Sequence, residues 1–226
     1  MSVPGLDVLV RLIGAEIEWA RSATGDGCDA EDRTVLDRLA VAFGGLAPKE
    51  GPVPVPHAAV DRWVDAAVVL TPERQRPLAE AFRLVAAYLV WKTAYAGAPS
   101  STMMRNFWAN YAYALLASPG IDDGGDSPLL SPEMSLYLVV HGAGVEYGRH
   151  HHPAVEVYGI ISGSALWFMG DRGFRRRRPG DVFVHQADIV HATTTDAEPT
   201  ISWVAWLGDL ESRPLLEGPD GSLVTV

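Results

Sequence analysis

The sequence lacks the features that mark several large classes of protein. Its single cysteine, Cys28, excludes an intramolecular disulfide and a thiolate metal cluster. Cys28 lies in the polar stretch GDGCDAED, where no basic neighbour favours the thiolate, so we do not expect a catalytic thiol. No uncharged apolar run reaches the ~18 residues of a transmembrane helix. The N-terminal stretch MSVPGLDVLVRLIGAEIEWARS lacks the basic start of a signal peptide, so a cytoplasmic location is expected.

Positive charge is also scarce. The chain carries 18 Lys and Arg against 28 Asp and Glu, which gives a net charge of −10. Binding to nucleic acid or to an anionic membrane needs clustered cationic side chains. We therefore expect neither nucleic acid nor a membrane as a partner.

The 226 residues divide into two differently patterned regions. Residues 1–100 form an α-helical N-terminal region, because apolar residues recur there at helical spacing. Predicted helices begin near Leu6, cover Asp32 to Phe43 and Ala58 to Leu70, and begin again at Thr71-Pro72-Glu73. The stripe of this last helix continues through Leu78, Phe82, Val85, Leu89 and Trp91.

Residues 101–226 are patterned as short β-strands separated by turn residues. The predicted runs cover 106–118, 135–152, 154–170, 181–186, 189–195 and 200–208. Strands at this spacing without intervening helices indicate an antiparallel sandwich or barrel. We expect both regions to form one folding unit, because the broad apolar stripes of the helices need the barrel or a second subunit to cover them.

A cluster of metal-ligand residue types stands in the stretch GVEYGRHHHPAVEVYGIISG, residues 144–163. Alternation along a strand places His150 and His152 on one face and His151 on the other. Glu156 follows with the same parity, and His191 ends a later β run. Three histidines and one carboxylate suit a single divalent transition metal ion: Zn, Fe, Mn, Ni or Co.

This stretch resembles the first cupin motif, in which a glycine, His-x-His, a glutamate and a second glycine stand at fixed distances. In this chain these positions are Gly144, His150, His152, Glu156 and Gly163. The second cupin motif is matched in its histidine, His191, but not in its proline, second glycine and asparagine, where Gln186, Asp188 and Thr195 stand. The resemblance implies a mainly β protein, a cupin jelly-roll barrel preceded by helices. His141 and His185 have no support from either motif, and we expect His185 on a strand or turn near the barrel mouth.

At a finer level the sequence is similar to the cupin-type dimethylsulfoniopropionate lyases. The similar pieces are the string YxxHxHPAxExY from Tyr147 to Tyr158, the later His191, and Trp206 fifteen residues further on. The resemblance implies that His150, His152, Glu156 and His191 bind the metal. It also implies that Tyr158 is the catalytic base and that Tyr147 and Trp206 line the substrate pocket.

Aromatic side chains support a pocket for a cation. Beside Tyr147, which we also assign to catalysis, Trp108 and Tyr111 are predicted to bind substrate, since aromatic faces attract an onium group by ~1–2 kcal/mol per ring. The implied reaction removes a proton next to a carboxylate and releases dimethyl sulfide and acrylate. The implied substrate carries a carboxylate and a sulfonium group, and the implied assembly is a homodimer.

Two other functions remain open from the residues alone. The same four ligands suit an iron-dependent cupin dioxygenase that acts on a small thiol or an aromatic acid, although such an enzyme has no clear need for Tyr158. A non-catalytic cupin that binds a sugar or another small molecule is the third reading. Arg175 to Arg178, between the two motifs, are expected in a solvated turn or edge.

Overall fold

Two facing β-sheets form the body of the protein. The computed structural model describes residues 2–22, 29–120, 125–217 and 223–225, and the side chains of 223–225 lie outside the description. Cys28 falls outside the described residues. The first sheet has the strand order β1-β4-β3-β5-β12-β7-β10, with β2 paired to β3, and the second has the order β14-β13-β6-β11-β8-β9. Of the described strand pairs within the two sheets, only β3 with β4 is parallel.

The strands of the first sheet are β1 (Ala47–Pro48), β2 (Trp91–Lys92), β3 (Tyr111–Ser118), β4 (Leu129–Leu130), β5 (Met134–His141), β7 (Val155–Ser162), β10 (Val182–His185) and β12 (Thr200–Leu207). Those of the second are β6 (Glu146–His151), β8 (Ala165–Met169), β9 (Phe174–Arg177), β11 (His191–Thr195), β13 (Leu215–Glu217) and β14 (Leu223–Thr225). This arrangement is the cupin jelly roll that the resemblance to the first cupin motif implies.

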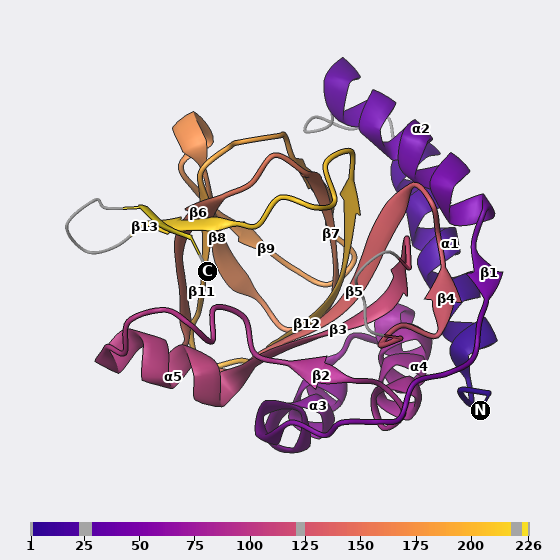
Figure 1. The fold of residues 1–226 in the computed structure, drawn as a ribbon, viewed down its shortest axis with the longest axis horizontal. Coiled ribbons are helices and arrows are strands. Elements are labelled where there is room, and N and C mark those ends of the chain that lie inside the picture. The colour runs from indigo at the N-terminus through magenta and orange to yellow at the C-terminus, as the bar shows by residue number, and fades with distance from the viewer. Residues whose placement is uncertain (1, 23–28, 121–124, 218–222, 226) are drawn as a thin grey trace.

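Helices cover the outer face of the first sheet. They are α1 (Leu6–Ser22), α2 (Ala30–Gly44), α3 (Ala58–Leu70) and α4 (Arg76–Ala86), and α5 (Thr102–Asn110) leads into β3. Figure 1 shows α1–α4 gathered on one side of the molecule, with the strands of the second sheet on the other. No helix in the described part of the chain is long and apolar enough to span a membrane.

Alternation along β7 separates two hydrophobic cores. Val157 and Ile161 belong to the core shared with the helices, whereas Tyr158 and Ile160 belong to the core inside the barrel. Because neighbours in a strand point to opposite faces, Glu156 enters the barrel with Tyr158. The outer core contains side chains from the helical region and from the sheet alike, as expected for one folding unit. The boundary at residue 100 stays a prediction.

The second glycine of the first cupin motif has a backbone reason. Gly163 follows β7 with φ +72°, and a Cβ at this position would lie 1.9 Å from the carbonyl oxygen of Pro199. A side chain is therefore disfavoured by the left-handed backbone and by the close approach of Pro199, which leads into β12.

Three local predictions are wrong: the strand over 106–110, the helix start at Thr71, and the continuation of that helix to Trp91. Residues 106–110 are helical, because Ser101 caps α5 by accepting a hydrogen bond from the Met104 N–H at 3.1 Å, and Met104 and Phe107 then share a buried face. Thr71 ends α3 and does not cap the next helix: its hydroxyl donates to the Ala67 carbonyl at 3.0 Å.

After Thr71 comes a short 3-10 turn, Glu73–Gln75, and α4 ends at Ala86. Leu89 and Trp91 are buried beyond the helix, and Trp91 lies in β2 with its indole N–H donating to Ala86 O at 2.8 Å. The arginine-rich segment forms β9 at the edge of the second sheet. The expected edge is therefore present, and the expected turn is not. Arg175, Arg176 and Arg178 are exposed as predicted, whereas Arg177 is half-buried, with its guanidinium over the Phe183 ring.

Candidate metal centre and active site

Strand pairing brings the cluster together inside the barrel. In the second sheet His191 on β11 is paired with His150 on β6, and in the first sheet His185 on β10 is paired with Glu156 on β7. His152 lies just after β6. These side chains are 1–3% exposed, so the cluster is enclosed by the two sheets.

The three predicted histidine ligands are oriented in the same way. Nδ1 of each lies at a backbone carbonyl oxygen two residues away: His150 at Gly148, His152 at Ala154 and His191 at Ile189, at 2.8–3.0 Å. A Nδ1–H that donates to a carbonyl leaves Nε2 with its lone pair, which is the form that binds a metal. Ligand atoms of His150, His152 and His191 lie within 4.8 Å of one another.

Glu156 is held from both sides of its carboxylate. Oε1 accepts a hydrogen bond from the indole N–H of Trp206 at 2.7 Å. Oε2 lies 3.1 Å from His185 Nδ1, 3.3 Å from His191 Nε2 and 3.8 Å from His152 Nε2. The carboxylate therefore joins the histidines of both sheets.

Burial and mutual charge set the protonation of the cluster. Burial alone would raise the pKa of Glu156, but the adjacent rings of His152, His185 and His191 hold that pKa well below its ordinary value. Burial lowers the pKa of His150 well below its ordinary range, and the neighbouring His191 adds to the effect. Burial also lowers the pKa of His185, to about 4. For His152, burial is outweighed by the nearby charge of Glu156, and its pKa is raised. The buried carboxylate, with the imidazoles of His150 and His185 whose pKa values are lowered, is a donor set suited to a cation.

The residues present fit a divalent metal ion. Nε2 of His152 and of His191 is buried and has no hydrogen-bond partner among the described residues, and a buried polar atom normally has one. Imidazole nitrogens and a carboxylate oxygen are ligands of Zn and of the neighbouring first-row metals. His151 lies outside the cluster, with Nδ1 3.8 Å from Asp188 and 22% of its side chain exposed.

His185 belongs to the cluster, and the sequence reading missed it. Glu156, His185 and His191 form a second group with ligand atoms within 4.8 Å of one another. The signal that could have found it is the run VFVH, in which Val184 packs on the helical side and Phe183 in the barrel core. The same alternation turns His185 into the barrel.

A cavity of about 520 Å³ opens beside Glu156. Its wall is rich in aromatic side chains and is completed by the segments 94–97 and 210–214, which lie outside the barrel strands. The aromatic residues that line it are Tyr95, Tyr111, Tyr113, Tyr137, Tyr147, Tyr158 and Trp206. A concave aromatic space with a few charged side chains, Glu156, Glu211 and Arg213, is the kind of site that takes a small ligand.

The predicted substrate residues occupy this cavity with one exception. Tyr147, Tyr158, Tyr111 and Trp206 line it, whereas Trp108 is not among the described lining residues. Trp108 stands on α5, not on a strand, and its indole N–H donates to the carbonyl of Tyr95 at 3.2 Å. The Tyr147 ring is stacked on His150 with centroids 4.0 Å apart.

Tyr95 is a second residue that the sequence reading missed. It has φ 57°, which is a strained backbone for a bulky residue. Its hydroxyl accepts a hydrogen bond from the Tyr147 hydroxyl at 2.9 Å, and its ring contacts His150 edge-on. No motif marks it, because it reaches the cavity from the connection between β2 and α5.

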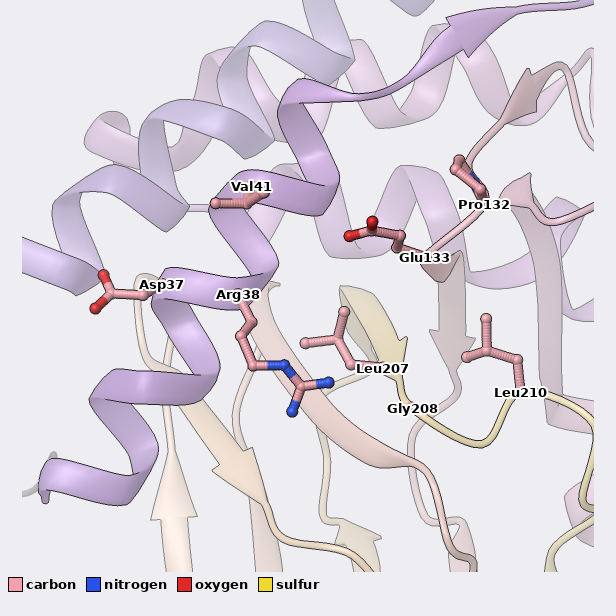
Figure 2. Close-up of a pocket in the computed structure, with 8 residues that line it drawn as sticks. All are labelled: Asp37, Arg38, Val41, Pro132, Glu133, Leu207, Gly208 and Leu210. Atoms are coloured by element: carbon pink, nitrogen blue, oxygen red, sulfur yellow. The ribbon is translucent and has the colours of Figure 1, made fainter.

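Another surface pocket holds none of this chemistry. Figure 2 shows it between α2 and the turns that flank β5 and β12, with Arg38, Val41 and Glu133 among its lining residues. None of the described residues that line it is a histidine or a tyrosine. The cavity beside Glu156 is therefore the better candidate for the active site.

This fold and its buried histidine–glutamate cluster define a cupin. The model of the dimethylsulfoniopropionate lyase family matches residues 31–202. The dimethylsulfoniopropionate lyase DddQ of Ruegeria pomeroyi is 34% identical over 172 residues, which cover 76% of this chain and 80% of that protein. The chain belongs to the dimethylsulfoniopropionate lyase family, and it is a carbon–sulfur lyase.

Solved structures agree with this assignment. The crystal structure of DddQ from Ruegeria pomeroyi DSS-3 superposes with a TM-score of 0.77 at 28% identity, covering 98% of this chain and 100% of that one. A structure reported with the lyases RdDddP and RnDddQII has a TM-score of 0.70 at 21% identity, covering 95% and 98%, and supports the fold alone.

Proposed function

We propose that this chain cleaves dimethylsulfoniopropionate by β-elimination into dimethyl sulfide and acrylate. The observation that carries the proposal is that Glu156 and Tyr158 line one tyrosine-rich cavity, with the histidine cluster beside it. Membership of the lyase family supports the same substrate.

His150, His152, Glu156 and His191 are the proposed ligands of one divalent ion of the Zn, Fe, Mn, Ni and Co group. When bound, such an ion supplies positive charge that offsets the substrate carboxylate and favours the phenolate of Tyr158. Trp206 and the backbone carbonyls at Gly148, Ala154 and Ile189 orient these ligands through the hydrogen bonds described above.

Tyr158 is the proposed base. Burial, reinforced by the charge of Glu156, raises its pKa well above the ordinary value of 10, so the phenolate needs a nearby positive charge. Its oxygen takes the proton from the α-carbon of the substrate. The electron pair of that C–H bond forms the Cα–Cβ double bond, the Cβ–S bond breaks, and its electron pair leaves on sulfur as neutral dimethyl sulfide. The remaining fragment is acrylate.

The aromatic wall is proposed to hold the sulfonium group. Tyr147, Tyr111 and Trp206 line the cavity, and a desolvated cation over an aromatic face gains ~2 kcal/mol. Tyr147 is fixed by its stacking on His150 and by its hydrogen bond to Tyr95. Trp108 would act only through the Tyr95 carbonyl that it binds.

The test uses substrate deuterated at the α-carbon. If Tyr158 removes that proton in a rate-limiting step, kcat/KM should fall by a primary isotope effect, and dimethyl sulfide and acrylate should form in equal amounts. Formation of 3-hydroxypropionate in place of acrylate would instead indicate displacement by water and would refute the elimination.

We also propose a homodimer, formed through the helical side. Support for this face comes from Val69 on α3 and Leu84 on α4, large apolar side chains that are 74% and 50% exposed and that a partner subunit would cover. Light scattering after size exclusion should give twice the mass of 24.4 kDa; a monomer mass would refute this assembly.

A further inference from the structure

His185 is buried in the barrel without a role in the proposed reaction. It is 1% exposed and stands opposite Glu156 in the pairing of β10 with β7. Its Nδ1 lies 3.1 Å from Glu156 Oε2. On the far side of the same carboxylate, the Trp206 N–H donates to Oε1. The two residues flank Glu156 from the two strands adjacent to β7.

The direction of the His185 contact follows from its partner. A carboxylate oxygen only accepts hydrogen bonds, so Nδ1 of His185 must carry a proton in order to be stable at 3.1 Å. In the neutral ring the other nitrogen, Nε2, is then an acceptor, and it is buried without a hydrogen-bond partner among the described residues. His185 is thus a donor to Glu156.

The hydrogen-bond partner of Nδ1 differs between His185 and the other cluster histidines. His150, His152 and His191 each turn Nδ1 to a backbone carbonyl. His185 instead turns Nδ1 to the carboxylate. Groups that donate a hydrogen bond to a metal-binding carboxylate fix its orientation without binding the metal themselves. Loss of such a group typically weakens metal binding about 10–100-fold.

We infer that His185 is a positioning residue that, with Trp206, fixes the Glu156 carboxylate for metal binding. This inference rests on the proposed metal site of the lyase. It assigns His185 to Glu156, because Nδ1 is the ring nitrogen that lies at the carboxylate. Binding of its Nε2 to the metal is the alternative that the variants below test.

Two amide variants separate these roles. The amide nitrogen of asparagine is as many bonds from Cα as Nδ1 of histidine, so His185→Asn can still donate to Oε2. The amide nitrogen of glutamine corresponds to Nε2, so His185→Gln places its donor away from Oε2. The measurement is the dissociation constant of Zn²⁺, by competition with a chromophoric chelator, on metal-stripped wild type and both variants. His151→Asn, outside the cluster, is the control.

We expect His185→Gln to bind Zn²⁺ about 10–100-fold more weakly than wild type, with His185→Asn and His151→Asn within a few-fold of it. Equal affinity of wild type and both His185 variants would overturn the inference, and so would equal losses in both, which would make His185 a ligand. Wild type that binds no Zn²⁺ would instead refute the proposed metal site itself.

Folding of the stripped variants is checked by circular dichroism. If His185→Gln does not fold, the Co²⁺ spectrum of His185→Asn decides, since the proposed ligands are unchanged in that variant. A visible spectrum identical to that of Co²⁺-loaded wild type supports the inference, and an altered spectrum overturns it.

Discussion

At the scale of single residues, the account depends most on the hydroxyl of Tyr158. Removing it in Tyr158→Phe keeps the ring between Phe183 and Trp167 but removes the base. We expect turnover to fall by at least ~100-fold with the bound metal unchanged, measured by product formation and by elemental analysis of one sample. Tyr88→Phe, at an exposed tyrosine outside the cavity, is the control. Turnover close to wild type in Tyr158→Phe would remove Tyr158 as the base.

Two adjacent histidines provide a second test at this scale. His152→Ala removes a buried nitrogen that faces the cluster, and we expect metal affinity to fall at least ~10-fold. His151→Ala removes a partly exposed ring that lies outside the cluster, and this variant should keep the metal affinity of wild type. Equal losses in both variants would contradict the strand alternation on which the ligand assignment depends.

How far single residues could be predicted depended on the kind of signal they carry. The convergence of His150, His152 and Glu156 was predictable, because they stand at fixed distances within one motif. His191 was expected at the end of a β run, but it begins β11, and the pairing of β11 with β6 brings it to His150. His185 and Tyr95 were not found. His185 needed the pairing of β10 with β7, and Tyr95 acts through a left-handed backbone in a loop, which no periodicity reports.

At the scale of elements, Gly163 tests the turn that follows β7. Gly163→Ala forces a Cβ against Pro199 on a backbone with positive φ, and we expect the free energy of unfolding to fall by about 2–4 kcal/mol. Gly44→Ala is the matched control: Gly44 lies in α2 with open space around it and should gain up to about 1 kcal/mol. Denaturant titrations measure both. An unchanged stability in Gly163→Ala would contradict the close approach.

Elements with a strong period were predicted better than their ends. Strands β5 to β8 and β10 to β12 and the second and third helices lie where alternation and apolar stripes indicated. The start of α4 and the whole of α5 were wrong because a local side chain decided them: the Thr71 hydroxyl turns back to its own helix, and Ser101 caps a helix whose bulky residues also fit a strand. Edge strand β9 has too few apolar residues to show a pattern.

At the scale of the whole molecule, Glu16 joins the helices to the barrel. Its carboxylate accepts hydrogen bonds from Gln75 at 2.5 Å and from the indole N–H of Trp203 on β12 at 2.6 Å. Glu16→Ala leaves two donors without their acceptor, and we expect a loss of about 2–4 kcal/mol in unfolding free energy. Glu18→Ala on the same helix breaks an exposed pair with Arg21 and should change stability by less than about 1 kcal/mol.

The difference in unfolding free energy between wild type and Glu16→Ala should change with pH in a defined direction. Burial raises the pKa of Glu16 above 4.5, against the opposing hydrogen bonds from Trp203 and Gln75. The folded protein therefore holds the proton more tightly than the unfolded chain. The advantage of wild type over Glu16→Ala should be largest below pH 4.5 and should shrink as pH rises through the folded pKa. An advantage that grows over this range would contradict the assignment.

Division into a helical region and a barrel was predictable from the change of period near residue 100, and so was the need of the helices for a partner surface. The shared outer core joins the two regions, so circular dichroism of the helices and fluorescence of the barrel tryptophans should report one coincident unfolding transition. Two separated transitions would show that the regions fold independently.

The proposed lyase reaction in the barrel requires a bound divalent metal ion. The most direct test is dimethyl sulfide in the headspace above purified protein with dimethylsulfoniopropionate, measured on one preparation as purified, after metal stripping, and after reloading with each divalent ion of the proposed group in turn. The account predicts release that is lost on stripping and restored by at least one ion. No release above the stripped control from any reloaded, folded sample would contradict it.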